Sequence, residues 1–460
     1  MRNREENTMK KRMAALLGAL TLGLGLLAGC TNTAGAGASA GGSGLPNAAN
    51  GTLDPNDPIT ITFYSYNLSN PSQAETMQAI IDGFNETVGK EKGIIVEGVA
   101  DEVTGNLTKT KADIQAGNQV NIIQHTFPTL DSSRLNLGIQ AYEDIFPADE
   151  MEEHFAGIDG GARQLGVIDG KTYGIAFTFS TPVMYINADL LREAGLDPET
   201  DAPKTWDEML TVCRTIKEAT GKYGLCLPAT ATNSWITESL IFSNGGTMLS
   251  EDRTEATFAS EETVEAFTIW KQLYDEGLCA PGTETEAAQQ FFTENAAMYL
   301  SSTAVQSSIQ QAADAAGWEL TGAAEPAFGD KETAPTNSGS CLAVRASSDD
   351  EAAACWEFIK YATSAESYTM ITTGIGYLPL RSDIVDDPAY LKDYADANPL
   401  LRVNMTQLEK IHPSTIWPGN EANEINTIFC DAVTKAITTD ADILETLQEA
   451  QDQINALIGQ

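Results

Sequence analysis

Basic side chains and histidines are scarce in this sequence. Its 460 residues contain 27 Lys and Arg against 65 Asp and Glu, which gives a formal net charge of −38, and only three His. Nucleic acids are held largely by Lys and Arg contacts to phosphate, so this balance excludes a nucleic-acid-binding protein that works through a basic surface. The apolar content of 42% is that of a globular chain, because disordered chains contain fewer apolar side chains.

Long apolar runs are also lacking, apart from one near the N-terminus. A mainly apolar segment over residues 14–28 follows a stretch rich in Lys and Arg over residues 2–12. A basic stretch before a short apolar run is typical of a secretory signal peptide and not of a spanning helix. We therefore predict a signal peptide over residues 1–29 and exclude a polytopic membrane protein.

The end of this segment resembles the bacterial lipobox. Residues 27–30 read Leu-Ala-Gly-Cys, and the resemblance implies cleavage before Cys30 and lipidation of its sulfur. A plain signal peptide with an incidental cysteine is the alternative. Residues 30–56, rich in Ala, Gly, Ser, Thr and Asn, predict a flexible tether. Two acyl chains anchor a protein stably, so we expect a chain on the outer face of a membrane, extracellular or periplasmic.

Motifs of exported hydrolases are missing as well. The sequence contains no His-Glu-x-x-His zinc motif and no Gly-x-Ser-x-Gly nucleophile motif. His125, His154 and His412 are isolated from one another, so we interpret them as surface or packing residues. We predict no catalysis, no metal and no cofactor. An exported glycan-active enzyme stays an alternative, because 65 acidic residues offer many possible carboxylate pairs.

Six cysteines follow Cys30, namely Cys213, Cys226, Cys279, Cys341, Cys355 and Cys430. Export permits disulfides, and an even number allows three of them, although the 15 possible connectivities leave the pairing open. Buried free thiols are the alternative. No pair has the Cys-x-x-Cys spacing of a metal site.

Strand and helix patterns alternate from about residue 57 onward. Period-two or apolar runs predict strands over 59–64, 94–99 and 120–124, and Asp169-Gly170 predicts a hairpin within 167–177. Helical patterns and capping residues predict the following helices: 73–88, 104–116, one from Thr205 to about 219, one from Ser348 to about 362, 421–438 and 441–458. This alternation predicts an α/β fold with mostly parallel sheets, and the length predicts two lobes.

Several segments together resemble the family 1 extracellular solute-binding proteins of ABC importers. Within this family they are most similar to the branch that binds glycerol-3-phosphate or sugars. The strongest are Phe179-Ser-Thr-Pro-Val-Met-Tyr-Ile-Asn187 and Pro203-Lys-Thr-Trp-Asp-Glu-Met-Leu210, with support from residues 291–298, 338–344 and 374–379. The resemblance implies a type II periplasmic-binding-protein fold, in which crossover segments join two lobes around a ligand cleft. It implies one lobe of residues 57–178 plus 326–376 and another of 179–325 plus 377–460. The implied protein is a monomer that delivers a small molecule to permease subunits driven by an ATPase.

The resemblance also assigns ligand-binding residues. It matches Ser180, Ser302, Gly339 and Tyr377 to contacts of the family's ligand, and Trp235 to an aromatic platform. Serine hydroxyls both donate and accept hydrogen bonds, a glycine allows close approach to the backbone, and aromatic faces cover the apolar faces of sugars. Two further aromatic residues are assigned to the cleft: Phe127 and Trp417.

Four positions depart from the glycerophosphate branch. Val103 replaces a tyrosine, Phe127 a glutamate, Thr232 a tryptophan, and Asn426 the arginine that clamps phosphate. Loss of both the glutamate and the arginine predicts a neutral ligand, and the aromatic residues suit a sugar or oligosaccharide. Glycerol-3-phosphate or a glycerophosphodiester stays the alternative within the class. A surface adhesion module is a further alternative, but neither repeats nor a large apolar face support it.

Overall fold

The computed structural model describes residues 44–102, 107–230 and 234–458, and of these residues 45–458 belong to one compact unit. The predicted signal peptide, Cys30, most of the tether, Val103 and Thr232 lie outside the described residues.

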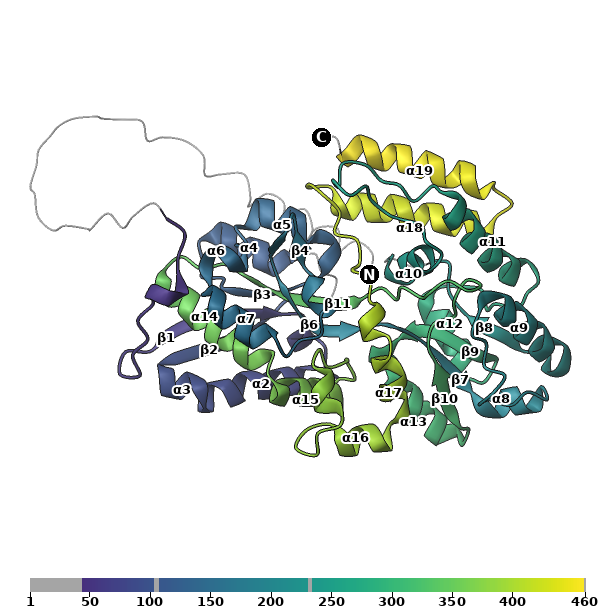
Figure 1. The fold of residues 1–460 in the computed structure, drawn as a ribbon, viewed down its shortest axis with the longest axis horizontal. Coiled ribbons are helices and arrows are strands. Elements are labelled where there is room, and N and C mark those ends of the chain that lie inside the picture. Colours follow the sequence, from purple (N-terminus) through teal and green to yellow (C-terminus); the bar gives the residue numbers. More distant parts are fainter. Residues whose placement is uncertain (1–43, 103–106, 231–233, 459–460) are drawn as a thin grey trace, which may run out of the picture. The chain divides into compact units, whose positions relative to one another are not determined.

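Two separate β-sheets organise this unit (Figure 1). The first has five strands in the order β2-β1-β3-β11-β6: Ile94–Ala100, Ile59–Ser65, Ile122–His125, Ser338–Val344 and Ile175–Ser180. The second has four strands in the order β10-β7-β9-β8: Leu320–Ala323, Pro182–Asn187, Ala296–Ser302 and Tyr223–Cys226. A short hairpin joins β4 (Val167–Ile168) to β5 (Lys171–Thr172). We call the elements around the five-stranded sheet the first lobe and those around the four-stranded sheet the second lobe.

Both sheets are mixed, so the prediction of mostly parallel sheets is wrong. Strand β1 runs parallel to β2 and β3, but β11 is antiparallel to both β3 and β6. In the second lobe β8 is parallel to β9, whereas β7 is antiparallel to β9 and β10. The antiparallel pairs arise where the chain passes between the lobes, because β6, β7 and β11 leave or enter a sheet there.

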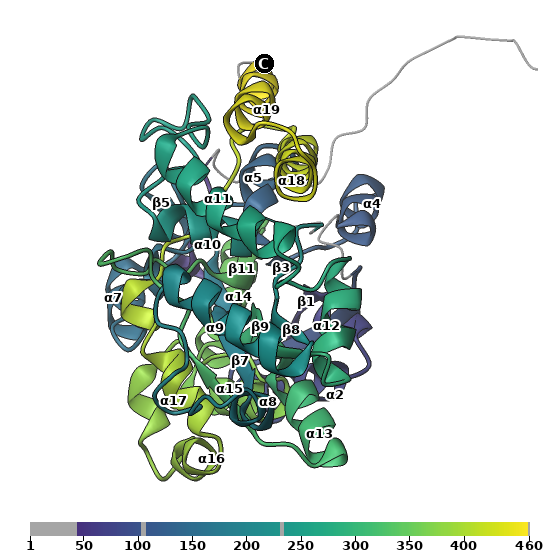
Figure 2. The same ribbon diagram turned by 90° about the vertical axis from the view of Figure 1, so that its right-hand side faces the viewer.

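Helices cover both sheets. Those that pack with the five-stranded sheet and its loops are α2 (Ala74–Glu86), α3 (Val88–Lys92), α4 (Thr108–Ala116), α5 (Leu130–Leu137), α6 (Tyr142–Ile145), α7 (Ala148–Phe155), α14 (Asp349–Ala362) and α15 (Ala365–Gly374). The others are α8 (Ala188–Glu193), α9 (Trp206–Thr220), α10 (Trp235–Ser243), α11 (Glu261–Asp275), α12 (Glu284–Phe292), α13 (Gln306–Ala316), α16 (Lys392–Ala397), α17 (Pro399–Met405), α18 (Ala422–Thr438) and α19 (Ile443–Ile458). Figure 2 shows α18 and α19 at the top of the molecule and α16 and α17 at the bottom.

Short 3-10 turns complete the chain: η1 (Ala48–Asn50), η2 (Asn67–Ser69), η3 (Phe127–Thr129), η4 (Ala162–Gln164), η5 (Thr303–Val305), η6 (Ser382–Val385) and η7 (Leu408–Lys410). Local chemistry explains several of the predicted boundaries. The side chain of Thr205 accepts the backbone N–H of Glu208 at the start of α9, and Ser348 does the same for Glu351 at the start of α14. The hairpin turn places Asp169 and Gly170 at positive φ, 52° and 77°, as a two-residue turn of this kind requires.

Three passages of the chain connect the lobes. The first is at Thr181, between β6 and β7, and the second is the segment between β10 and β11. The third follows residue 376, and Leu378, Leu380 and Leu408 on this part of the chain pack in the core of the first lobe. The segment between them straddles the lobes, since Leu400 belongs to a core of the second lobe.

The last part of the predicted tether is attached to the first lobe. The backbone N–H of Asn47 donates to Asp349 Oδ1 at 2.8 Å, and that of Thr52 donates to Asp350 Oδ1 at 2.6 Å. Both acceptors lie in the first turn of α14, which their negative charge also stabilises. Residues 45–56 are therefore part of the folded unit.

The six described cysteines are buried and free, so the expectation of disulfides is wrong and the alternative of buried thiols is correct. They lie within the hydrophobic cores, where a thiol packs as a small apolar group. Burial raises the pKa of all six thiols, which keeps them protonated. Among the described residues no helix is long and apolar enough to cross a membrane, and no three potential metal ligands lie together.

Candidate functional site

A row of neutral polar side chains crosses the five-stranded sheet near the passage to the second lobe. It runs from Ser65 at the end of β1 through Gln124 of β3 and Ser340 of β11 to Thr178 of β6. Ser65 Oγ donates to Gln124 Oε1 at 2.5 Å, Gln124 Nε2 donates to Ser340 Oγ at 2.8 Å, and the Ser340 and Thr178 hydroxyls are 2.5 Å apart. We call these four residues the polar row. All four are buried, and Gln124 is only 2% exposed.

Residues that follow β1 extend the polar row. Gln124 Nε2 also donates to Asn67 Oδ1, and Asn67 Nδ2 donates to Gln73 Oε1 at 2.6 Å. The hydroxyl of Tyr66 lies 3.1 Å from Thr178 Oγ1. Burial raises the pKa of Tyr66 and of Tyr377, so both phenols stay protonated and can donate hydrogen bonds.

The structure brings four of the predicted ligand-binding residues to this place. Ser180 pairs with Ser338, Gly339 pairs with Phe179, and Ser302 pairs with Pro182, just after Ser180. Tyr377 precedes Leu378, whose backbone N–H donates to the Phe179 carbonyl at 2.8 Å. Ser180, Ser302, Gly339 and Tyr377 therefore surround the passage from β6 to β7.

Gly339 cannot carry a side chain in this backbone. Its φ is +109°, and a Cβ atom would lie 2.0 Å from the Thr178 carbonyl oxygen. The position is thus fixed by close backbone approach, next to a bulge between Gly339 and Cys341.

The three predicted aromatic residues have different environments. Trp235 is half-buried at the first turn of α10. Phe127 is buried in the core of the first lobe and Trp417 is 0% exposed in a core of the second, although the Trp417 backbone N–H donates to the Pro128 carbonyl. Neither Phe127 nor Trp417 therefore presents a ring face to a solute in this structure.

Hydrogen bonds around the buried acid Glu325 connect the three passages. The hydroxyl of Ser239 donates to Glu325 Oε2 at 2.5 Å and accepts the backbone N–H of Thr336 at 3.2 Å. The backbone N–H of Glu325 donates to Gln407 Oε1, and Gln407 Nε2 donates to the Pro182 carbonyl at 2.8 Å. Burial raises the pKa of Glu325 to about 8, so this group is protonated at neutral pH.

A second buried acid, Glu238, accepts the Ser234 hydroxyl at 2.5 Å and the backbone N–H of Thr415 at 2.7 Å, and burial raises its pKa as well. Sequence reasoning missed both acids and the polar row. The two buried acids could not be recognised from the sequence, because it contains 65 acidic residues. The row could have been recognised from polar residues inside otherwise apolar strands, such as Gln124 in Ile122–His125.

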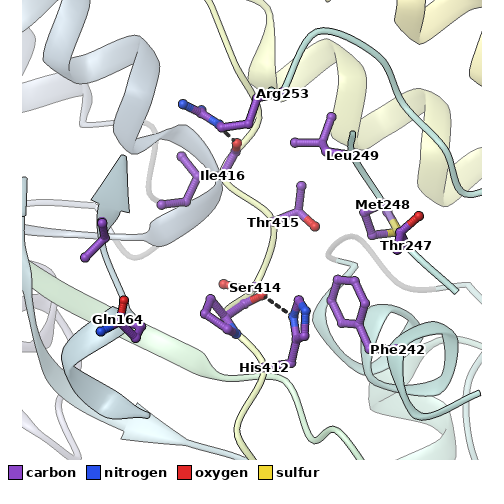
Figure 3. A pocket seen from close by; sticks show the side chains of 12 residues that line it. Gln164, Phe242, Thr247, Met248, Leu249, Arg253, His412, Ser414, Thr415 and Ile416 are labelled. Carbon is purple, nitrogen blue, oxygen red and sulfur yellow. Dashed lines mark hydrogen bonds between the residues drawn. The ribbon is translucent and has the colours of Figure 1, made fainter. Parts of the chain in front are cut away.

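A cavity of about 230 Å³ lies beside the third passage, between residues of both lobes (Figure 3). Phe242 and His412 stack on one side of it, with ring centroids 3.7 Å apart. Burial lowers the pKa of His412, so the imidazole is neutral and packs, as predicted for the histidines. On the opposite side Arg253 donates to the Ile416 carbonyl at 3.2 Å.

The described polar row contains hydroxyl and amide groups only. Its recorded hydrogen-bond partners include no Lys, Arg, Asp or Glu side chain. Such an arrangement can donate to and accept from neutral oxygen atoms.

Parts of the sequence are similar to known binding proteins. A putative binding protein of Brucella abortus is 31% identical over 126 residues, 27% of this chain and 29% of that protein. An arabinooligosaccharide-binding protein of Halalkalibacterium halodurans is 25% identical over 64% of this chain and 67% of that protein. The periplasmic sn-glycerol-3-phosphate-binding protein UgpB of Salmonella typhimurium is 26% identical over 61% of this chain and 66% of its own length. The chain thus matches less than a third of the Brucella protein and about two thirds of the other two.

Solved structures share the two-lobed fold. The cyclic alpha-maltosyl-1,6-maltose binding protein of Arthrobacter globiformis superposes with a TM-score of 0.75 at 22% identity, over 87% of this chain and 99% of that one. UgpB of Mycobacterium tuberculosis, solved with glycerophosphocholine, superposes with a TM-score of 0.71 at 20% identity, over 87% of this chain and 98% of that one. The family model of bacterial extracellular solute-binding proteins matches residues 79–398. The chain belongs to the family of bacterial extracellular solute-binding proteins.

Proposed function

We propose that this protein captures a carbohydrate, a sugar or oligosaccharide, between its two lobes and delivers it to the permease of an ABC importer. The observation that carries this proposal is the neutral polar row beside Ser180, Ser302, Gly339 and Tyr377. Sugar hydroxyls both donate and accept hydrogen bonds, and the row and its neighbours offer hydroxyl and amide partners. The named arabinooligosaccharide- and maltose-type relatives support the same ligand class.

Four of the assigned residues have a role in this proposal. Ser180, Ser302 and Gly339 lie where the two sheets meet, so a solute held there contacts both lobes. Trp235 supplies an aromatic face at the first turn of α10, which is the surface that covers the apolar side of a pyranose ring. Closure of the lobes around the solute gives the conformation that the permease recognises. The solute is released unchanged, because solute-binding proteins bind and do not catalyse.

Binding of a glycerophosphate is the second candidate, because two of the compared proteins are UgpB proteins. A phosphate group is normally held by Arg or Lys or by a helix N-terminus. Neither basic residue type is among the recorded hydrogen-bond partners of the polar row, so the structure favours the neutral solute.

A thermal-unfolding screen of residues 45–460 tests the proposal. The panel contains maltotriose, arabinotriose, glycerol-3-phosphate and glycerophosphocholine. A solute that binds only the folded state stabilises it by about 2.7 kcal/mol at a hundredfold excess over Kd. We expect stabilisation by a sugar. Stabilisation by the glycerophosphates alone would overturn the carbohydrate assignment, and a chemically altered sugar after incubation would support the glycan-active enzyme.

We further propose that the chain is a monomeric lipoprotein anchored through Cys30 to the outer face of the membrane. The lipobox-like residues 27–30 and the basic and apolar segment before them support this. Metabolic labelling with palmitate, followed by membrane fractionation, tests it. We expect label in the wild type and its loss in Cys30→Ser. Equal labelling of both would overturn the anchor.

A further inference from the structure

Helix α10 supplies hydrogen-bond acceptors to the passages that connect the lobes. Leu240 and Ile241 bury one side of the helix in the core of the second lobe. On another side, three α10 side chains accept backbone N–H groups of the second and third passages. These bonds run from Ala334 to Ser243 Oγ at 2.8 Å, from Thr336 to Ser239 Oγ at 3.2 Å and from Thr415 to Glu238 Oε2 at 2.7 Å. The helix is thereby attached to the passages from its first turn to its last.

Trp235 belongs to the same side of α10. It precedes Glu238 by three residues, Ser239 by four and Phe242 by seven, and residues with these spacings share one side of a helix. Phe242 stacks on His412 of the third passage (Figure 3). Glu238 and Ser239 are fully buried, whereas Trp235 at the first turn is half-buried. The side of α10 that contacts the passages therefore ends in an aromatic side chain that solvent still reaches.

Glu238 fixes the backbone next to Trp235 from two directions. Its backbone N–H donates to the Ser234 carbonyl at 2.8 Å, and its Oε1 accepts the Ser234 hydroxyl at 2.5 Å. Its other oxygen accepts the backbone N–H of Thr415. One carboxyl group thus joins the residue before Trp235 to the third passage. Ser234, Glu238 and Thr415 are all buried, so water competes little for these bonds.

We propose that Glu238 is the positioning residue of Trp235: its carboxyl holds the first turn of α10 on the third passage and so keeps the Trp235 ring where it covers the apolar face of a bound sugar. This proposal rests on the proposed function. Glu238 is fully buried and acts through Trp235, not on the solute itself. A residue that only stabilises the fold would change the unfolding midpoint and leave the ring and the affinity as they are.

Two substitutions of Glu238 differ in the contacts that they keep. An amide oxygen accepts and an amide nitrogen donates. In Glu238→Gln the oxygen can accept from Thr415 while the nitrogen donates to the Ser234 hydroxyl oxygen, so both contacts are kept. Glu238→Met has a similar length but no hydrogen-bonding group of this kind, so both are lost. We expect Glu238→Met to bind the sugar about tenfold more weakly than the wild type, and Glu238→Gln to retain its affinity.

Ser243→Ala is the matched control, because it removes a bond of the same kind at the other end of the same helix. Ser243 accepts the backbone N–H of Ala334. It is the last residue of α10, about 12 Å along the helix from Trp235. We expect Ser243→Ala to lower the unfolding midpoint and to bind the sugar as the wild type does.

Two measurements follow affinity and the position of the ring separately. Calorimetry of residues 45–460 with maltotriose and arabinotriose gives the affinity. Fluorine NMR of the chain labelled with fluorotryptophan reports on the ring without any sugar. The sequence contains six tryptophans, and Trp235→Phe identifies the signal of Trp235. We expect this signal to shift or broaden in Glu238→Met and to stay in place in Glu238→Gln and Ser243→Ala.

A double-mutant cycle tests whether Glu238 acts through Trp235. The combination of Trp235→Ala with Glu238→Met is expected to bind no more weakly than Trp235→Ala alone, since the ring that Glu238 positions is already gone. Ser234→Ala keeps the proposal testable if Glu238→Met does not fold. It removes one of the two contacts, so we expect a loss of affinity of about threefold and a change in the Trp235 signal.

The outcomes separate this proposal from the proposed function. If a sugar binds the wild type and Glu238→Met equally well, the role of Glu238 is overturned and the carbohydrate assignment stands. The same follows if Glu238→Met weakens binding equally in the Trp235→Ala background, if Ser243→Ala loses as much affinity as Glu238→Met, or if the Trp235 signal is unchanged in Glu238→Met and Ser234→Ala. If the wild type binds neither sugar, the proposed function fails and the role of Glu238 in it fails too.

Discussion

Arg253 Nη1 lies 3.0 Å from Asp169 Oδ1, and this ion pair joins the tips of two turns from different lobes. Both residues have positive φ, 59° and 52°, a conformation that non-glycine residues adopt mainly in turns. Arg253 also lies 3.6 Å from Asp131 Oδ2, which accepts the backbone N–H of Gly419 at 2.9 Å. One arginine of the second lobe thus contacts two acids of the first.

The two acids are expected to contribute unequally to stability. The Asp169 side chain is 66% exposed, and an exposed ion pair contributes less than about 1 kcal/mol. The Asp131 side chain is 4% exposed, so loss of Arg253 removes one of its few compensating partners. We expect Arg253→Gln to lower the free energy of unfolding by about 1–2 kcal/mol and Asp169→Asn by less. Urea unfolding of both variants checks this, and an equal loss in both would show that Asp131 contributes nothing.

The raised pKa of Glu325 is expected to make the free energy of unfolding depend on pH. Burial raises its pKa from 4.5 to about 8 in the folded chain. Between these values the folded state holds a proton that the unfolded state has released, so stability falls as pH rises. The contribution of Glu325 is complete below pH 4.5 and is lost as pH rises through 8. We expect Glu325→Gln, which is neutral at every pH, to reduce the slope by about 1.4 kcal/mol per pH unit between pH 5 and 8.

Unfolding in urea at pH 5, 6, 7 and 8 measures this slope for the wild type and Glu325→Gln. Glu238 is also buried with a raised pKa, but it is present in both proteins and cancels from the difference. Glu319→Gln is the matched control, because this acid is exposed beside Arg192. Identical slopes in the wild type and Glu325→Gln would contradict a protonated Glu325.

Local patterns were sufficient to predict the hairpin and six of the longer helices, but not the other helices. The apolar residues Met77, Ile80, Ile81 and Phe84 recur at helical spacing, and all four are buried in α2. A capping side chain marks the start of α9 and of α14 where the sequence placed it. These features depend on residues within one or two turns, so the sequence reveals them directly.

Strand order and direction were not predictable in the same way. Period-two alternation tells which side chains face a core, but β11 pairs with β3 and β6 from more than 150 residues away. The polar row was missed for the same reason, since Ser340 meets Gln124 and Thr178 only through that pairing. The even number of cysteines likewise led to the wrong expectation of disulfides, because a count carries no information on where the thiols are buried.

A substitution at Gly339 tests how much the close contact between β6 and β11 contributes to stability. A Cβ atom there meets the Thr178 carbonyl oxygen at 2.0 Å, and this oxygen cannot move without disturbing the pairing of the strands. We expect Gly339→Ala to lower the free energy of unfolding by about 2–4 kcal/mol, through the positive φ and the clash together. Gly317→Ala is the matched control, because Gly317 has a φ of +82° with no atom within 4 Å of its Cβ position.

The control is expected to cost only about 1 kcal/mol, the conformational part of the effect. Thermal and urea unfolding compare the two variants. Equal losses would mean that the contact at Gly339 relaxes easily and that the position is not needed for the register of the sheet.

Substitutions at Trp417 and Trp235 test whether each tryptophan packs in the core or binds the solute. Trp417 is fully buried and its indole N–H has no recorded hydrogen-bond partner, so its contribution comes from packing. We expect Trp417→Ala to lower the free energy of unfolding by about 3–5 kcal/mol, and Trp417→Phe by clearly less, because no hydrogen bond is lost.

Trp235 is half-buried, so Trp235→Ala is expected to lose about 1 kcal/mol of stability and more than tenfold in affinity for the sugar that stabilises the wild type. Unfolding and sugar binding are measured on Trp417→Ala, Trp417→Phe and Trp235→Ala. Parallel losses of stability and affinity in Trp235→Ala would assign the Trp235 ring to the core, whereas a loss of affinity alone places it against the solute.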